Sequence, residues 1–316
     1  MNYHTLSDFR SGTGDLLDRL LTESVAGLMV EGLVTLDRVA QDGMKVRASA
    51  GAASFHREPS LQKLLAEAEA HVAELKQELE TDPAASKTRQ QAARHRAAEE
   101  RAARIRAALE QLPQIAASKK PADRDDARAS TTDADARVMK TADGGFRPAY
   151  NVQLATVTDA QIITGVDVTN SGGDQGKMAP MVEQHQERYA ETPKEMLVDG
   201  GFVKKSDIDA VSVPHGTTTV YAPVMKSKDP NRDPHEPRDD DSPAVAEWRQ
   251  RMATDEAKAI YKERAATAEC VNALARNRGL QQFRVRGLKK VKAVALWYAL
   301  AHNLMRAVAL RAAVAA

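Results

Sequence analysis

The chain has 316 residues, of which 42% are hydrophobic and 28% are charged, with a formal net charge of +1 at pH 7. This length supports a substantial core in one or two domains, and the near-balance of charge excludes a uniformly basic coat for nucleic acid. The single cysteine, Cys270, excludes a disulfide framework and a thiolate metal site.

Residues 15–35 carry apolar residues at helical spacing and are expected to form one amphipathic helix. In the next segment, 36–57, the apolar pattern runs through Val39 and Ala40, stops at Asp42-Gly43 and resumes at Val46. We therefore predict a strand, a break at Gly43 and a second extended piece, which would place Asp42 at the end of a strand.

Residues 58–120 show a heptad pattern, with apolar residues in alternating steps of four and three. The first series is Leu61, Leu65, Ala68, Val72, Leu75 and Leu79, and the second is Ala98, Ala102, Ile105, Leu109 and Leu112. The sequence TDP at 81–83 separates them and is expected to stop the first helix. The pattern predicts an inserted antiparallel helical hairpin with a structural rather than a catalytic role.

The segment 121–148 is a polar bridge, which we expect to be an exposed or partly disordered loop. In 149–225 the period changes to two, which predicts strands at 149–157 and 161–170, a helix at 177–190, a strand ending at Asp199 and another at 217–224. This alternation of strands and helices is typical of an α/β fold. Four prolines and many charges make 226–243 a flexible excursion, and 244–316 is expected to be helical with breaks near Gly279 and Gly287.

The last part of the chain is basic, since no Asp or Glu follows Cys270. Such a run is either a solvated helix face or a surface for a phosphate backbone. Its apolar segment AVALWYALA, 293–301, is too short to span a bilayer, and the N-terminus lacks a signal-peptide core. We therefore expect a cytoplasmic protein without membrane association. The basic residues are Arg276, Arg278, Arg284, Arg286, Lys289, Lys290 and Lys292.

Carboxylates are the residues best suited to chemistry, because HExxH and Walker motifs are absent and no histidines have zinc-ligand spacing. Asp42 and Asp199 would face the crevice at the strand ends of an α/β sheet, and a third carboxylate from a helix would complete oxygen ligation of magnesium. The expected third residue is Glu269, on a helix with Tyr261, Arg264 and Arg276. Taken alone, however, Asp-Gly favours a turn, and Glu269 favours an ordinary surface position.

Five segments together resemble a DDE transposase of bacterial insertion sequences: YHTLSDFR (3–10), VAQDGMKVRASAGAASFHR (39–57), DARVMKTADGGFRPAYNVQLAT (135–156), LVDGGF (197–202) and YKERAATAE (261–269). The resemblance implies an RNase H-like mixed sheet flanked by helices, with the hairpin inserted and a helical C-terminus. It also implies that Asp42, Asp199 and Glu269 hold two Mg²⁺ ions, for which Mn²⁺ can substitute. DNA strand cleavage at the element ends and strand transfer into a target would follow by a two-metal mechanism.

The resemblance further implies that Tyr261 and Arg264 orient the Glu269 helix and contact phosphate, and that Arg276 stands where relatives carry lysine. The basic residues from Arg278 to Lys292 would then hold the DNA backbone. The implied partners are double-stranded DNA and a second copy in a synaptic homodimer, in the cytoplasm at the nucleoid.

The match begins partway through the family's N-terminal helical DNA-binding region, so 1–35 is expected to be its remnant and the chain N-terminally truncated. The alternative is accordingly a truncated, inactive remnant that binds DNA or pairs with another subunit. A third option is an RNase H-like nuclease that is not a transposase.

Overall fold

The computed structural model describes residues 5, 8–9, 12–81, 89–226 and 231–315. Parts of four predictions lie outside these residues: the beginning of the region 1–35, the break after residue 81, part of the excursion 226–243 and the last residue of the helical region 244–316. The chain forms two compact units. Unit 1 comprises residues 1–46, 151–282 and 289–316, and unit 2 comprises 47–150 and 283–288.

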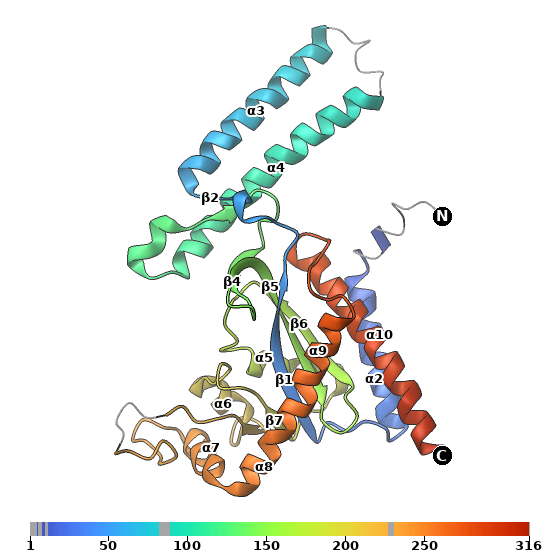
Figure 1. The fold of residues 1–316 in the computed structure, drawn as a ribbon, viewed down its shortest axis with the longest axis vertical. Helices are drawn as coiled ribbons and strands as arrows, with labels where there is room; N and C mark the ends of the chain where they lie inside the picture. Colours follow the sequence, from blue (N-terminus) through green and yellow to red (C-terminus); the bar gives the residue numbers. More distant parts are fainter. Residues whose placement is uncertain (1–4, 6–7, 10–11, 82–88, 227–230, 316) are drawn as a thin grey trace. The chain divides into compact units, whose positions relative to one another are not determined.

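The sheet of unit 1 is mixed (Figure 1). The antiparallel strands β5 (Phe146–Val157) and β6 (Ile163–Thr169) agree with the expected strands, and β5 also neighbours β1 (Arg38–Arg47). On the other side of β1, the short strands β7 (Glu195–Leu197) and β8 (Thr219–Tyr221) continue the sheet in parallel. Residues 148–157 of β5 are buried in succession, so both faces of this strand are covered. The result is an α/β unit with a mixed sheet.

Helices flank this sheet (Figure 1). Helices α2 (Gly14–Val30) and α5 (Met178–Tyr189) pack against β6, and α7 (Pro243–Ala253) and α8 (Asp255–Arg264) pack against β8. Among its described residues, unit 1 also contains the helices α6 (Lys205–Val211), α9 (Cys270–Asn277) and α10 (Leu288–Val314), with a π-helical segment, η4 (Ala265–Glu269), before α9.

The first described helix is shorter than predicted. The expected extent was 15–35, but α2 ends at Val30. Gly32 has a φ of +71°, a left-handed conformation that turns the chain out of the helix. Apolar periodicity continues past the end because Val34 and Leu36 are buried after the turn.

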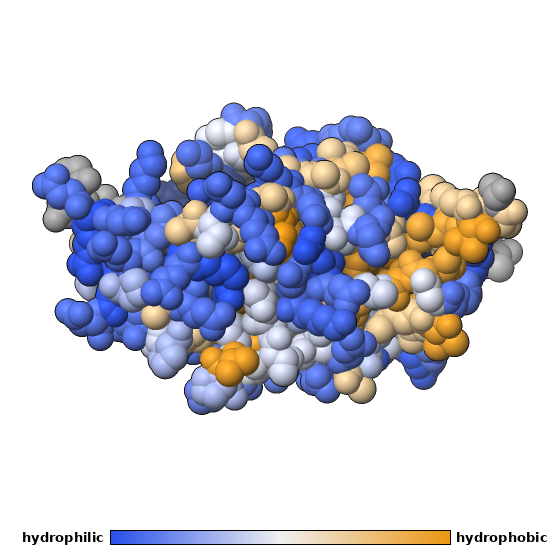
Figure 2. Space-filling model, turned by 90° about the horizontal axis from the view of Figure 1, so that it is seen from below, coloured by the Kyte–Doolittle hydropathy of each residue, from blue (hydrophilic) through white to orange (hydrophobic). Residues whose placement is uncertain are grey.

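Helix α10 contains the apolar run 293–301 and is much longer than that run. By length and composition alone this helix could cross a membrane, as the core helix of a globular protein also could, so the absence of membrane association stays a prediction. Its packing is that of a core helix, because Asn303 accepts a hydrogen bond from Ile163 N and donates one to Ile163 O, both at 2.8 Å. Figure 2 shows hydrophobic side chains gathered at one end of this view. Leu304 and Val308 of α10 are exposed.

Buried His185 anchors α5 to β6 and makes the stability of unit 1 depend on pH. Its Nδ1 donates to Met181 O at 2.7 Å, and its Nε2 accepts from the Thr164 hydroxyl at 2.8 Å. Burial lowers the pKa of His185 to about 4, whereas the unfolded chain has the ordinary value near 6.5. The contribution to stability is therefore present above pH 6.5 and is lost as the pH falls toward 4, by about 3 kcal/mol in total.

We expect urea unfolding at a series of pH values between 7.5 and 4 to show this decrease in the free energy of unfolding. The variant His185→Gln should show a flatter profile, whereas His215→Gln, which changes an exposed histidine, should retain the wild-type slope. Equal slopes for wild type and His185→Gln would contradict the assignment.

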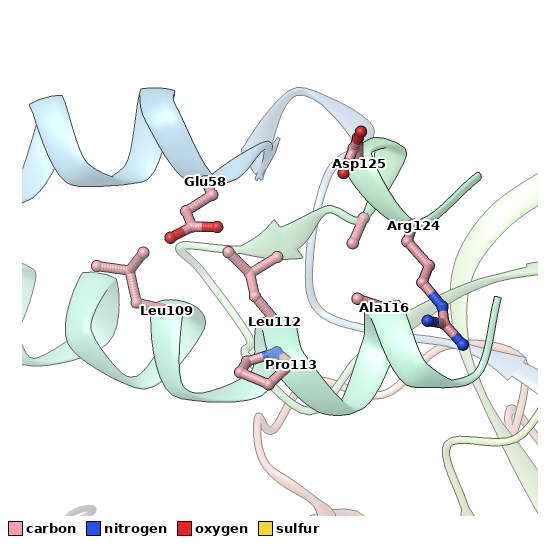
Figure 3. A pocket seen from close by; sticks show the side chains of 8 residues that line it. Glu58, Leu109, Leu112, Pro113, Ala116, Arg124 and Asp125 are labelled. Atoms are coloured by element: carbon pink, nitrogen blue, oxygen red, sulfur yellow. The ribbon is translucent and has the colours of Figure 1, made fainter. Parts of the chain in front are cut away.

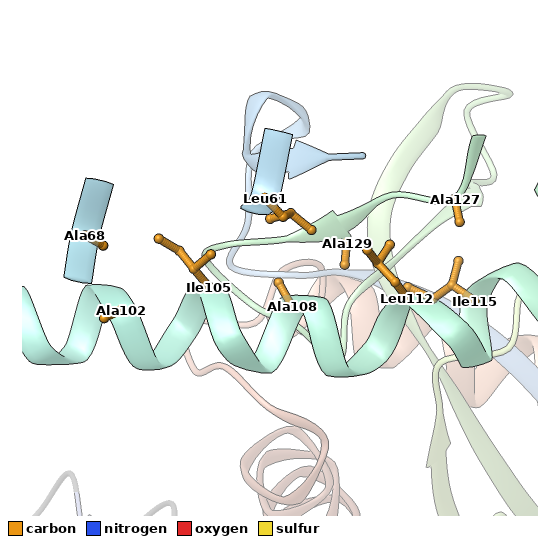
Figure 4. Close-up of a cluster of buried hydrophobic side chains, with 9 residues drawn as sticks. All are labelled: Leu61, Ala68, Ala102, Ile105, Ala108, Leu112, Ile115, Ala127 and Ala129. Atoms are coloured by element: carbon orange, nitrogen blue, oxygen red, sulfur yellow. The ribbon is translucent and has the colours of Figure 1, made fainter. Parts of the chain in front are cut away.

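The core of unit 2 lies between two helices, α3 (Glu58–Thr81) and α4 (Arg89–Ala117), which lie side by side (Figure 1). Figure 4 shows the apolar face of α4 toward α3 and toward strand β3 (Ala129–Ser130). Alanines in this face let the helices approach closely, and the Arg106–Glu69 ion pair, at 2.9 Å, lies on the exposed side. Unit 2 also has a cavity of about 220 Å³, which is lined by Leu109, Leu112 and Pro113 and by the Glu58 side chain (Figure 3).

The polar bridge 121–148 is more ordered than predicted. It contains a 3₁₀ turn, η3 (Pro121–Asp126), as well as β3 and β4 (Arg137–Lys140), and β4 pairs with the first residues of β5. Strand β3 pairs with β2 (Phe55–His56), which follows the turn η1 (Ala52–Ser54). Polar side chains of the bridge are buried because they form hydrogen bonds. The Tyr150 hydroxyl donates to Asp133 at 2.7 Å, and the hydroxyls of Ser130 and Ser54 form a hydrogen bond of 2.8 Å.

Candidate active site

Asp42 lies inside a continuous strand, so the predicted break at Gly43 was wrong. Gly43 does not form a turn; it allows other side chains to approach the backbone of β1 closely. A Cβ built on it would lie 2.5 Å from Gln153 Nε2 and 2.8 Å from Asn151 Oδ1, and it would also overlap the Asp174 carboxylate. The missing side chain therefore makes room for polar groups directly beside Asp42.

Asp199 is brought beside Asp42 by the pairing of β1 with β7. The parallel register pairs Val39 with Met196 and Ala40 with Leu197. Asp42 comes two residues after Ala40, and Asp199 comes two residues after Leu197. Asp199 also begins a turn, because its Oδ1 accepts a hydrogen bond from Gly201 N at 2.7 Å. The expectation that the two carboxylates come from neighbouring strands therefore agrees with the register.

The electrostatics of Asp42 reflect this crowding. Burial raises the pKa of Asp42, the positive charge of Arg264 opposes the rise, and the carboxylates of Asp199 and Asp174 add to it. Asn272 on α9 fixes the same carboxylate by donating to Asp42 Oδ2 at 2.9 Å. The negative charges of Asp42, Asp174 and Asp199 thus lie close together, and a cation would be stabilised beside them.

Arg264 connects the three predicted carboxylates. Its Nη1 lies 3.8 Å from Asp42 Oδ2, and its Nη2 lies 3.3 Å from Glu269 Oε1. Although burial opposes it, the pKa of Arg264 is raised by Tyr261, whose hydroxyl accepts from Nε at 3.3 Å, and by the charges of Asp42 and Asp199. One guanidinium therefore pairs with Asp42 and Glu269, and the negative charge of Asp199 also acts on it.

Glu269 reaches Arg264 through an irregular helix. The single helix predicted over 261–276 is interrupted by the π-helical segment η4, of which Glu269 is the last residue. A π turn places residues five apart on one side, and Arg264 and Glu269 are five apart. The Glu269 side chain is 58% exposed and that of Arg264 is 12% exposed, so the pair lies at the edge of the site.

Asp174, which was not predicted as a site residue, lies beside Asp42. Its Oδ1 accepts from Asn151 Nδ2 at 2.6 Å and from Gln153 Nε2 at 2.7 Å, and its Oδ2 lies 2.8 Å from Lys45 Nζ. The signal that could have revealed this network is the pair Asn151 and Gln153, two polar residues on one face of an otherwise apolar strand. The network holds β1, β5 and the loop before α5 together behind Asp42.

The donor chemistry suits a hard divalent cation, because the adjacent groups are carboxylate oxygens. Within the described residues, no three His, Cys, Asp or Glu side chains are grouped closely enough for metal binding. The third carboxylate, Glu269, is instead paired with Arg264. Asp42 and Asp199 thus offer carboxylate oxygens from adjacent strands, whereas Glu269 is held in an ion pair with Arg264.

The predicted DNA-backbone residues are divided between the two units. In unit 1, Arg276 and Arg278 are exposed at the end of α9, and Lys289 and Lys290 are exposed in the first turn of α10. The Lys292 side chain lies 3.6 Å from Asp167. In unit 2, Arg284 and Arg286 are exposed in the segment 283–288.

Residues 225–308 match the family model described as Transposase DDE domain. The matched segment is about a quarter of the chain and includes Tyr261, Arg264 and Glu269, while Asp42 and Asp199 lie outside it. Comparisons with curated proteins and with solved structures gave no match. The family match supports a relationship to the DDE transposases, whose substrate is DNA.

Proposed function

We propose that the chain is a transposase that cleaves the DNA ends of an insertion sequence and transfers them to a target by DDE chemistry. The observation that carries the proposal is the meeting of Asp42, Asp199 and Glu269 at one guanidinium, from two adjacent parallel strands and an irregular helix. The match of 225–308 to a transposase domain supports the same assignment. Action as a homodimer on paired ends, in the cytoplasm, is part of the proposal.

Asp42, Asp199 and Glu269 would hold two divalent ions in this function. When bound, Mg²⁺ would supply activation of the attacking oxygen and neutralisation of charge on the leaving oxygen. Asn272 keeps the Asp42 carboxylate oriented, and the Asp174 network keeps β1 in place behind it. Arg264, turned by Tyr261 toward the site, would exchange its carboxylate partners for a DNA phosphate.

The test is a cleavage assay on a supercoiled plasmid that carries the DNA flanking the coding sequence. We expect cutting at the element ends and joined products with Mg²⁺ or Mn²⁺, and loss of both in EDTA. Folded protein that binds the ends but leaves them intact with either metal would contradict the proposal and favour the inactive remnant. Cutting without preference for the ends would instead favour a nuclease that is not a transposase.

A further inference from the structure

Unit 2 contains a second candidate site, a cavity of about 440 Å³ that is open to solvent. Leu64 and Ile105 contribute apolar surface to it. Its polar lining, which we call the cationic cavity, consists of His56, Arg101, Arg104, Thr131, Thr132 and Arg286.

Three separate parts of the chain build the cationic cavity. Arg101 and Arg104 lie three residues apart on α4 and therefore on one face of that helix. The antiparallel pairing of β2 with β3 places His56 close to Thr131, whose backbone N–H donates to Ser54 O at 3.0 Å.

The third part, residues 283–288, is fixed to unit 2 by its backbone. Phe283 N donates to Arg47 O at 2.8 Å, and Leu288 N donates to Asp135 Oδ2 at 2.9 Å. Between these two contacts, Arg286 Nε donates to Ser49 O at 3.3 Å. The position of this guanidinium at the cavity therefore follows from the fold of unit 2 itself.

The charges at this cavity are poorly compensated. None of its described lining residues is acidic. Arg104 has an ion pair with Glu100, at 3.7 Å, but both side chains are exposed and such pairs contribute little. Three arginines that line one cavity without carboxylates attract an anion, and the threonine hydroxyls can donate to its remaining oxygens.

We propose that the cationic cavity binds phosphate groups of duplex DNA. A single phosphate would fill little of a cavity of about 440 Å³ and would leave guanidiniums without partners, whereas a backbone offers successive phosphates. The proposal rests on the proposed function only in taking DNA as the ligand. It gives the helical hairpin at 58–120, predicted to be structural rather than catalytic, a role in holding the substrate.

The experiment measures binding of a fluorescent DNA duplex to the full chain by anisotropy, in EDTA and at several salt concentrations. The test variant is Arg101→Ala with Arg104→Ala. The control removes the same charge from exposed positions nearer the start of α4, Arg94→Ala with Arg96→Ala. The test variant should bind roughly tenfold more weakly and lower the slope of log K against log salt by about 2. The control should change both quantities much less.

Equal effects of the two double variants, or no effect of the test variant, would overturn the proposal. A parallel titration with inorganic phosphate separates the two sources of phosphate. Loss of phosphate binding with unchanged DNA binding would assign the cavity to a small anion and would also overturn it. Because no readout requires cleavage, a chain that binds DNA as expected but fails to cut it contradicts the proposed function alone.

Discussion

The variant Asp199→Asn is expected to lose metal-dependent cleavage of element-end DNA, by at least roughly a hundredfold, while retaining DNA binding and the fold. The asparagine is almost isosteric and can keep the turn through the hydrogen bond that Gly201 N donates, so the structural role of Asp199 is largely preserved. What the substitution removes is the negative charge next to Asp42, on which the proposed divalent-cation binding would depend.

Two measurements distinguish loss of metal from loss of structure. Urea unfolding without metal should be close to wild type, whereas the stabilisation that added Mg²⁺ gives the wild type should disappear in the variant. The control is Asp255→Asn, which removes a fully exposed carboxylate on α8 and should leave cleavage unchanged. Wild-type rates of cutting and joining by Asp199→Asn would show that the metal assignment is wrong.

The second large effect is expected from Gly43→Ala, which should both destabilise unit 1 and abolish cleavage. The added Cβ would lie 2.5 Å from Gln153 Nε2 and 2.8 Å from Asn151 Oδ1, with Asp174 nearer still. These side chains cannot move away from the added Cβ independently, because Asn151 and Gln153 both donate to Asp174 Oδ1. Strand β1 must therefore shift, at a cost of about 1–3 kcal/mol, and Asp42 shifts with it.

The matched control is Gly27→Ala, at an exposed position on α2 where an added Cβ meets nothing within 4 Å. Because alanine favours the helix, this variant should gain about 0.4–1 kcal/mol in the free energy of unfolding. Urea unfolding and the plasmid assay check both variants. If Gly43→Ala unfolded at the wild-type urea concentration and still cut DNA, strand β1 would not depend on the space at Gly43.

Local sequence patterns predicted the strands well where the strand itself has a regular or continuous pattern of apolar residues. The period of two identified β5 and β6, and the apolar run before Asp199 identified β7. The same reasoning failed at Asp42-Gly43, because a glycine needed for space and a glycine needed for a turn look identical in sequence. Only contacts from the distant Asp174, Gln153 and Asn151 distinguish the two.

A common crevice for Asp42, Asp199 and Glu269 was predicted, but the irregular helix and the Asp174 network beside them were not. Arg264 and Glu269 suggested a regular helix, since periodicity cannot show one extra residue in a turn. Asp174 was not predicted because its loop has no regular sequence pattern and its hydrogen-bond partners lie on the distant strands β1 and β5. The same holds for Ser130 and Asp133, whose polarity suggested an exposed bridge although they are buried with hydrogen-bond partners.

The pairing of β1 with β7 also has a consequence for the order of synthesis. Arg38 and Glu195, which face each other at the start of this ladder, are 157 residues apart in the chain. At about 5–20 residues per second, the ribosome delivers the second strand roughly 8–30 s after the first. During that time β1 has no partner on this edge, and non-local pairings form late because loop closure must come first. The two aspartates therefore come together only after more than half of the nascent chain has emerged.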